Sequence, residues 1–211
     1  RFTSDAAHEL RSPLAALKVQ TDVAQLSQDD PQAQEKALTQ LHAGIDRASR
    51  LVDQLLTLSR LDSLDSLDGV EQIAMADLLQ SAVMDIYPPA QQAGIDIRLN
   101  INAPEVTRTG QQLLLSLLVR NLLDNATRYS PRGSVVDVTL DARRFTVRDN
   151  GPGISPDALA RLGERFYRPP GQDATGSGLG LSIVKRIAAL HGMHVALGNA
   201  PEGGFEVNVS W

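Results

Sequence analysis

Residues 2–14 read FTSDAAHELRSPL, and this stretch decides the fold expected for the first third of the chain. Apolar or small side chains recur from here at alternating steps of four and three, which is the seam of a coiled coil or helical bundle. At about 100° per residue, His8 points well over a right angle away from the middle of this seam. We therefore expect a helix that presents His8 to partners outside the bundle. The seam positions are Thr3, Ala7, Leu10, Leu14, Leu17, Thr21 and Ala24.

Three neighbours of His8 are typical of a residue with a catalytic role. Glu9 can orient the ring or accept its second proton, which leaves the other nitrogen as a nucleophile. Ser12 lies one turn further along the same face. Pro13 cannot bond the Glu9 carbonyl, so we expect the helix to bend one turn after the histidine. A single histidine in such a place is more often a solvated surface residue, so these positions alone leave both interpretations open.

A second helix is expected to follow a break at residues 28–31. Asp30 has the position of an N-cap and Pro31 that of the first helical residue. Apolar residues again recur in steps of three and four, from Leu38 to Leu55, and Leu51, Leu56 and Leu58 widen this face. One hairpin cannot cover that much apolar surface, so two hairpins are expected to pair into a dimeric four-helix bundle. Docking of the hairpin onto the second half of the same chain remains the alternative.

Residues 61–69 read LDSLDSLDG, an acidic repeat typical of a linker. We expect a helical domain at 1–64, a linker at 65–72 and a second domain at 73–211. In the second domain, antiparallel strands and helices in runs indicate an α+β two-layer sandwich. Strands are expected at 70–75, 95–101, 134–140, 145–148, 194–197 and 205–211, and helices at 76–93, 111–129, 156–164 and 179–190.

Four clusters in this second half suit a nucleotide. Asn121 and Asn125 lie one turn apart on one helix, which suits a divalent ion held between amide oxygens and phosphates. Residues 149–154, DNGPGI, end a strand with an acid and turn on two glycines. Residues 164–168, ERFYR, combine aromatic and basic groups. Residues 176–181, GSGLGL, open a helix with bare backbone N–H groups, a ready anion site.

Three other motifs are excluded. Ser177 stands where a Walker A loop requires lysine. The glycines lack the spacing and the preceding strand of a Rossmann turn. Ser12 occupies the position of the second histidine in an H-E-x-x-H zinc motif.

The stretch around His8 closely resembles the phosphoacceptor box of bacterial sensor histidine kinases. The four later clusters resemble, in order, the N, G1, F and G2 boxes of their ATP-binding domain, a Bergerat-type fold. The resemblance covers the chain almost end to end. It implies ATP-dependent autophosphorylation of His8, with Glu9 and Ser12 as further catalytic residues, and then phosphotransfer to an aspartate on the receiver domain of a response regulator. It also implies dephosphorylation of that regulator.

The same resemblance implies the roles of the nucleotide-site residues. Asp149 would bond the adenine amino group, and Asn125 would hold Mg²⁺ with Asn121 close by. Arg128 and Tyr129 would contact phosphate and adenine, and residues 169–177 would form a lid. The other ATP contacts implied are Gly151, Gly153, Phe166, Arg168, Gly176, Ser177, Gly178, Leu179 and Gly180.

Asn121 separates this chain from other ATPases of the fold. Gyrase-, Hsp90- and MutL-type enzymes carry a glutamate there, whereas an asparagine cannot act as a general base at neutral pH. We expect ATP to be bound without rapid hydrolysis. Of the remaining histidines, His191 ends a helix, where an imidazolium suits the dipole.

Composition limits the other function classes. A net charge of −5 leaves no basic surface for nucleic acid, and the lack of cysteine excludes disulfides and thiolate metal sites. No apolar run approaches the roughly 18 residues of a membrane span. Because Arg1 is not a natural start, we expect a soluble, cytoplasmic part of a longer bacterial inner-membrane protein. Two alternatives stay open: a chain that mainly dephosphorylates its regulator, and a nucleotide-binding module without turnover.

Overall fold

The computed structural model describes residues 2–27, 29–170 and 176–211. The chain divides into two compact units, Arg1–Arg60 and Leu61–Trp211, which are taken separately below. Within the described residues, no helix combines the length and the apolar character needed to cross a membrane.

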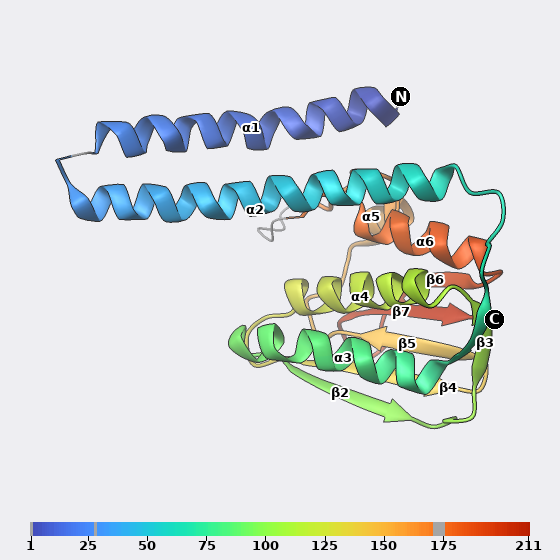
Figure 1. Ribbon diagram of the computed structural model, residues 1–211. Helices are drawn as coiled ribbons and strands as arrows, with labels where there is room; N and C mark the ends of the chain where they lie inside the picture. The colour runs from blue at the N-terminus through green and yellow to red at the C-terminus, as the bar shows by residue number, and fades with distance from the viewer. Residues whose placement is uncertain (1, 28, 171–175) are drawn as a thin grey trace. The chain divides into compact units, whose positions relative to one another are not determined.

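The first unit is a helical hairpin of α1 (Phe2–Leu26) and α2 (Pro31–Asp62), whose last two residues belong to the second unit (Figure 1). The start of α2 is as expected, because Asp30 Oδ1 accepts hydrogen bonds from the N–H groups of Gln32 and Ala33, each at 3.1 Å. The helices meet closely: a Cβ added at Gly44 would lie 2.7 Å from Leu17 Cδ2. Pro13 lies inside α1, which continues through it.

The hairpin leaves much apolar surface exposed. Along α1, a stripe that includes Leu10, Pro13 and Leu17 is partly buried, whereas Leu14 of the expected seam is 58% exposed. The stripe is narrower than expected, since within the hairpin α1 packs against a single helix. Further exposed apolar side chains on the two helices are Val19, Val23, Leu26, Leu38, Ile45, Val52 and Leu56.

The second unit is built on a five-stranded sheet with the strand order β2-β4-β5-β7-β6. Its strands are β2 (Asp96–Ile101), β4 (Val135–Asp141), β5 (Arg144–Arg148), β6 (His194–Asn199) and β7 (Phe205–Ser210). A separate two-stranded sheet joins β1 (Glu71–Ala74) and β3 (Thr107–Gly110).

Two features of the sheets differ from the expectation. β2 pairs with β4 in parallel, while every other pairing is antiparallel. A parallel pair needs a crossover, and α4 (Gln112–Tyr129) lies in the chain between these two strands. Strand β3 was not expected, because four residues without apolar alternation carry no strand signal.

Helices α3 (Met75–Gln92), α4 and α6 (Gly180–Leu190) cover one face of the five-stranded sheet (Figure 1). Alternate strand residues point into this layer and are fully or almost fully buried, among them Val136, Val138, Leu140, Phe145 and Val209. The short helix α5 (Pro156–Arg161) begins at an N-cap serine, Ser155, whose hydroxyl accepts from the Ala158 N–H. The two-layer α+β sandwich is therefore confirmed.

Candidate phosphoacceptor and nucleotide sites

The expected phosphoacceptor residues share one exposed stretch of α1. His8 and Ser12, one turn apart, are both exposed, and Glu9 is partly buried. The outward position of His8 is thus as the seam spacing indicates. A nucleophile that must meet a separate phosphate donor needs this accessibility.

In the second unit, the asparagine pair of α4 lies against the start of α6. A Cβ added at Gly180 would lie 3.3 Å from Asn121 Oδ1 and 3.5 Å from Asn125 Oδ1. Asn121 is 8% exposed, and its amide nitrogen donates to the Leu117 carbonyl at 2.8 Å. That bond occupies the nitrogen and leaves the amide oxygen on the side of Gly180. Asn125 Nδ2 lies at a similar 3.4 Å from that Cβ, so the side-chain amides of both residues converge on a helix N-terminus.

The N-terminus of α6 supplies positive potential at the same place. Free N–H groups in the first turn of a helix and the helix dipole both attract an anion such as phosphate. The entry to the helix is ordered by Ser177, whose Oγ accepts from the Leu179 N–H at 3.1 Å. Leu179 is fully buried, which anchors the turn in the core. The expected G2 cluster therefore lies beside the asparagine pair, at a helix N-terminus that would favour an anion.

Asp149 follows the last residue of β5 and is only 4% exposed. Its Oδ1 accepts from the N–H groups of Gly151 at 2.8 Å and Phe205 at 3.1 Å. Burial raises the pKa of this carboxyl above its ordinary 3.8, and the two backbone hydrogen bonds partly oppose that rise. Both donors use the same oxygen, and among the described residues Oδ2 makes no hydrogen bond. One oxygen is therefore available to accept from a ligand amino group.

Gly204 holds Asp149 in place, and sequence analysis did not identify it. It has φ +89°, and a Cβ here would lie 1.8 Å from the Asp149 carbonyl oxygen. The neighbouring Phe205 carbonyl accepts from the Asp149 N–H at 2.9 Å. Only a residue without a side chain allows this approach of the main chain just before β7. In the sequence, only the Gly203–Gly204 pair indicated that the main chain makes a close approach here.

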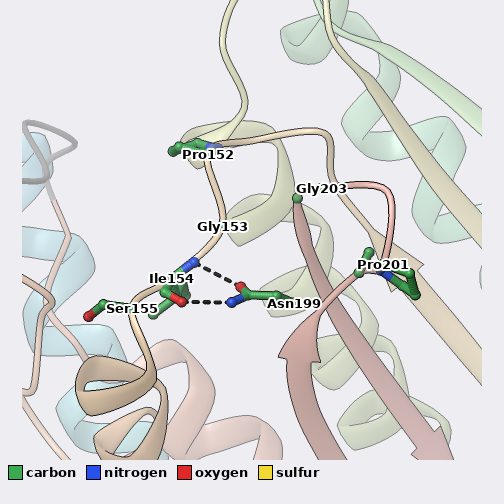
Figure 2. A pocket seen from close by; sticks show the side chains of 9 residues that line it. Pro152, Gly153, Ile154, Ser155, Asn199, Pro201 and Gly203 are labelled. Carbon is green, nitrogen blue, oxygen red and sulfur yellow. Dashed lines mark hydrogen bonds between the residues drawn. The ribbon is translucent and has the colours of Figure 1, made fainter.

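Asn199, at the end of β6, is a second residue that the motifs did not indicate. Its Oδ1 accepts from the Ile154 N–H at 2.8 Å, and its Nδ2 donates to the Ile154 carbonyl at 2.7 Å (Figure 2). This paired contact fixes the end of the 149–154 turn. A hollow of about 460 Å³ opens beside it. Gly153 is the one expected nucleotide contact that borders the hollow, and neither Asn121 nor Asn125 lines it.

The F and G2 clusters meet through two residues with left-handed backbone. Phe166 has φ +64°, an unfavourable value for an aromatic residue that costs about 1–3 kcal/mol. Its N–H donates to the Gly178 carbonyl at 3.1 Å, and a Cβ at Gly178 would lie 2.6 Å from the Phe166 carbonyl carbon. The main chains of the two clusters are therefore in direct contact.

The last expected contacts lie near the two ends of residues 169–177, the segment that the resemblance implies to be a lid. A Cβ at Gly176 would lie 3.3 Å from both Arg128 Nη1 and Tyr129 Oη, which brings these three residues together. Arg168 is exposed and lies at the other end of the lid segment. Within that segment, residues 171–175 lie outside the described residues.

Known proteins resemble this chain in both of its units. Residues 1–64 match the family "His Kinase A (phospho-acceptor) domain", and residues 110–211 match "Histidine kinase-, DNA gyrase B-, and HSP90-like ATPase". The sensor protein QseC of Salmonella typhimurium is 78% identical over the whole of this chain and 47% of its own length. The solved cytoplasmic segment of histidine kinase QseC is 63% identical, with a TM-score of 0.59 over 79% of this chain and 93% of that one.

The histidine kinase ThkA, solved in complex with the response regulator TrrA, shares the fold with a TM-score of 0.79. It is 19% identical, and the match covers 99% of this chain and 60% of that one. The chain belongs to the sensor histidine kinases, as its boxes indicated. It spans about half the length of the curated QseC relatives that it matches.

Proposed function

We propose that this chain transfers the γ-phosphate of ATP to a ring nitrogen of His8 and then to an aspartate of a response-regulator receiver domain. The observation that carries the proposal is the convergence of Asn121, Asn125 and the N-terminus of α6, in a chain whose other unit exposes His8. One unit holds a phosphate donor, and the other presents a nucleophile.

In the first step, the lone pair of the His8 nitrogen attacks the γ-phosphorus. The bond from that phosphorus to the bridging oxygen breaks, and ADP leaves with the electron pair. Glu9 orients the imidazole and accepts the proton of its other nitrogen. In the second step the phosphoryl group passes to the carboxylate of the regulator, and His8 is regenerated.

The nucleotide unit binds ATP but does not activate a water molecule to hydrolyse it. Asp149 Oδ2 accepts from the adenine amino group, and Tyr129 contacts the base. Arg128 and the N–H groups from Gly176 to Gly180 bind the phosphates. The remaining predicted contacts, Gly151, Gly153, Phe166 and Arg168, border the base and the lid. Because Asn121 cannot take a proton from water, the γ-phosphate is preserved for His8.

The site also fits Mg²⁺. Among the described residues there is no group of three or more His, Cys, Asp or Glu that could hold a metal, so carboxylates alone do not form a site. Mg²⁺ is bound in many phosphoryl-transfer sites through few protein oxygens together with substrate phosphates. The amide oxygens of Asn125 and Asn121 beside Gly180 meet that need. Bound there, the ion would neutralise phosphate charge.

We also propose that the hairpin dimerises into a four-helix bundle. The exposed apolar residues Leu38, Ile45 and Val52 are spaced by sevens on α2 and are 40% to 45% exposed. Val19, Val23 and Leu26 extend the apolar surface on α1. A helix pair with this much unpaired apolar surface is stabilised by a second copy.

The regulator is the expected second partner, since it must present its aspartate to the exposed face of α1 that carries His8. Ser12 on that face is proposed to hold water for dephosphorylation of the regulator. We further propose that this chain is the cytoplasmic part of a longer, membrane-anchored protein, since it covers 47% of a curated relative and resembles a solved segment described as the cytoplasmic segment of histidine kinase QseC.

Incubation with γ-labelled ATP, first alone and then with a receiver domain, tests the proposal. A kinase labels itself and then passes the label on. A chain that mainly dephosphorylates its regulator removes label only from a pre-phosphorylated receiver, and a binding module does neither. In the same assay, Ser12→Ala is expected to keep self-labelling and to slow dephosphorylation of the receiver. A parallel loss of both reactions would show that Ser12 only supports the helix before Pro13.

A further inference from the structure

The segment that follows the hairpin is held by one arginine of α6. Arg186 donates from Nε to the Leu61 carbonyl at 3.1 Å and from Nη2 to the Leu64 carbonyl at 2.6 Å. Arg186 is partly buried, and Leu61 is only 2% exposed. These carbonyls lie at or just after the C-terminal end of α2, where helix carbonyls have no partner within the helix.

Two more contacts hold the same segment. Arg165 Nη2 pairs with Asp62 Oδ1 at 2.8 Å, and Gln111 Nε2 donates to the Asp68 carbonyl. All of these residues belong to the second unit, because the boundary between the units falls after Arg60, inside α2. The stretch from Leu61 to Asp68 is therefore attached to the nucleotide unit, although from Ser63 on it contains neither helix nor strand.

Arg186 also lies on the helix that begins at the phosphate site. Gly180, at the N-terminus of α6, faces the asparagine pair, and Arg186 lies less than two turns further along the same helix. A short rigid element thus connects the place where the phosphates are expected to bind with the place where the hairpin is attached.

We propose that Arg186 is a positioning residue for phosphotransfer, because it clamps the C-terminal end of α2 onto α6. This inference rests on the proposed function. With the clamp closed, the connection between the units is short and ordered. Without it, residues 61–64 lose two main-chain contacts and the whole stretch becomes more mobile, so the effective concentration of bound ATP at His8 falls.

The test uses the full chain with Arg186→Ala. Hydrogen exchange of the backbone amides in residues 61–68 is expected to become faster. The affinity for ATP is expected to stay within about twofold, since Arg186 is not among the residues expected to bind the nucleotide. Phosphorylation of His8 at saturating ATP is expected to slow by about tenfold or more. Arg186→Lys keeps the charge but cannot bond both carbonyls, so its rate of His8 phosphorylation should lie between those of the unsubstituted chain and Arg186→Ala. Arg98→Ala, which removes an exposed arginine from β2, is the matched control and should change none of these values.

Faster exchange with an unchanged or increased phosphorylation rate overturns the positioning role. A loss of ATP affinity that accounts for the whole rate effect also overturns it, because Arg186 then acts on the nucleotide site itself. Asp62→Asn, which weakens the neighbouring Arg165 contact, should give a smaller slowing without loss of fold. If the unsubstituted chain itself fails to phosphorylate His8, the proposed function fails, whereas exchange in residues 61–68 that is unchanged in Arg186→Ala defeats the clamp alone.

Discussion

At position 204 the main chain passes so close to the Asp149 carbonyl that a side chain has no room. The 1.8 Å approach is to backbone, which cannot rotate away as a flexible side chain could. Gly204→Ala is therefore expected to lower the free energy of unfolding by about 3 kcal/mol or more and to weaken ATP binding by displacing Asp149. Urea unfolding and nucleotide titration measure the two effects.

Gly198→Ala is the matched control on the adjacent strand β6. A Cβ at Gly198 would meet nothing within 4 Å, so this variant should keep both stability and affinity. Equal behaviour of the two variants would contradict the role given to Gly204.

Of the two amides assigned to Mg²⁺, that of Asn125 is the one expected to hold the ion, with Asn121 close by. Asn125→Ala removes the oxygen that lies beside Gly180, so the affinity for Mg-ATP and the phosphorylation of His8 should both fall sharply. The affinity for ATP measured without Mg²⁺ should fall much less. Asn100→Ala on β2, an exposed asparagine away from the site, should leave all three values unchanged. A normal kinase rate in Asn125→Ala would show that the ion is held elsewhere.

For single residues, the spacing of residues along the sequence predicts the position of some site residues but not of others. The positions of His8 and of the asparagine pair follow from helix periodicity, so the sequence alone indicates their faces. Gly204 and Asn199 act through contacts with strands and turns far along the chain, such as the pairing of Asn199 with Ile154. No local pattern reports such a contact, because it depends on which strands become neighbours.

At the scale of elements, His191 joins the C-terminus of α6 to the N-terminus of α4. Its Nδ1 donates to the Ile187 carbonyl at 2.8 Å, and its Nε2 accepts from the Gln111 N–H at 3.1 Å. A ring that accepts at one nitrogen is neutral, so the imidazolium expected from the helix dipole is wrong. Burial, the larger cause, lowers the pKa of His191 below the ordinary 6.5, and the contact with the Ile187 carbonyl partly opposes this.

This contact predicts a pH dependence of stability. The unfolded chain takes up the proton near pH 6.5, but the folded chain does so only at lower pH. The contribution of neutral His191 to the stability of the fold is therefore present above pH 6.5 and is lost as the pH falls toward the pKa of His191 in the folded chain. Thermal unfolding between neutral and mildly acid pH should show the loss in the unsubstituted chain. The loss should be smaller in His191→Gln, and His194→Gln, at an exposed histidine, should retain it in full. An unchanged slope in His191→Gln contradicts this account.

The sequence indicated most elements, because long segments with a clear period of 3.6 or 2 report their own structure. Helices α1, α2, α4 and α6 and the alternating strands belong to this group. The parallel pairing of β2 with β4 was missed, since pairing direction is set by where α4 packs and not by either strand. The contacts of Arg186 with residues 61–64 were also not predicted, because an acidic segment without hydrophobic periodicity does not indicate which residues it contacts.

At the scale of the whole molecule, the exposed apolar row on α2 predicts a dimer of the chain. Ile45 is 45% exposed in the middle of the heptad row on α2. Ile45→Glu would bury a charge in the bundle core, so the variant is expected to sediment as a monomer at concentrations where the unsubstituted chain is a dimer. Leu113→Glu changes an apolar residue on α4 that is 80% exposed and should not alter the sedimentation coefficient. A monomeric unsubstituted chain would refute the bundle.

The central claim is that the two units perform one reaction, in which His8 receives the γ-phosphate of ATP. The most direct measurement is incubation of the chain and of His8→Ala with γ-labelled ATP, followed by acid or alkali treatment of the labelled protein. The account predicts label in the unsubstituted chain that is lost in acid and retained in alkali, as expected of an N–P bond. It predicts no label in His8→Ala, although that variant binds ATP with unchanged affinity. Acid-stable label, or label that persists in His8→Ala, would contradict the claim.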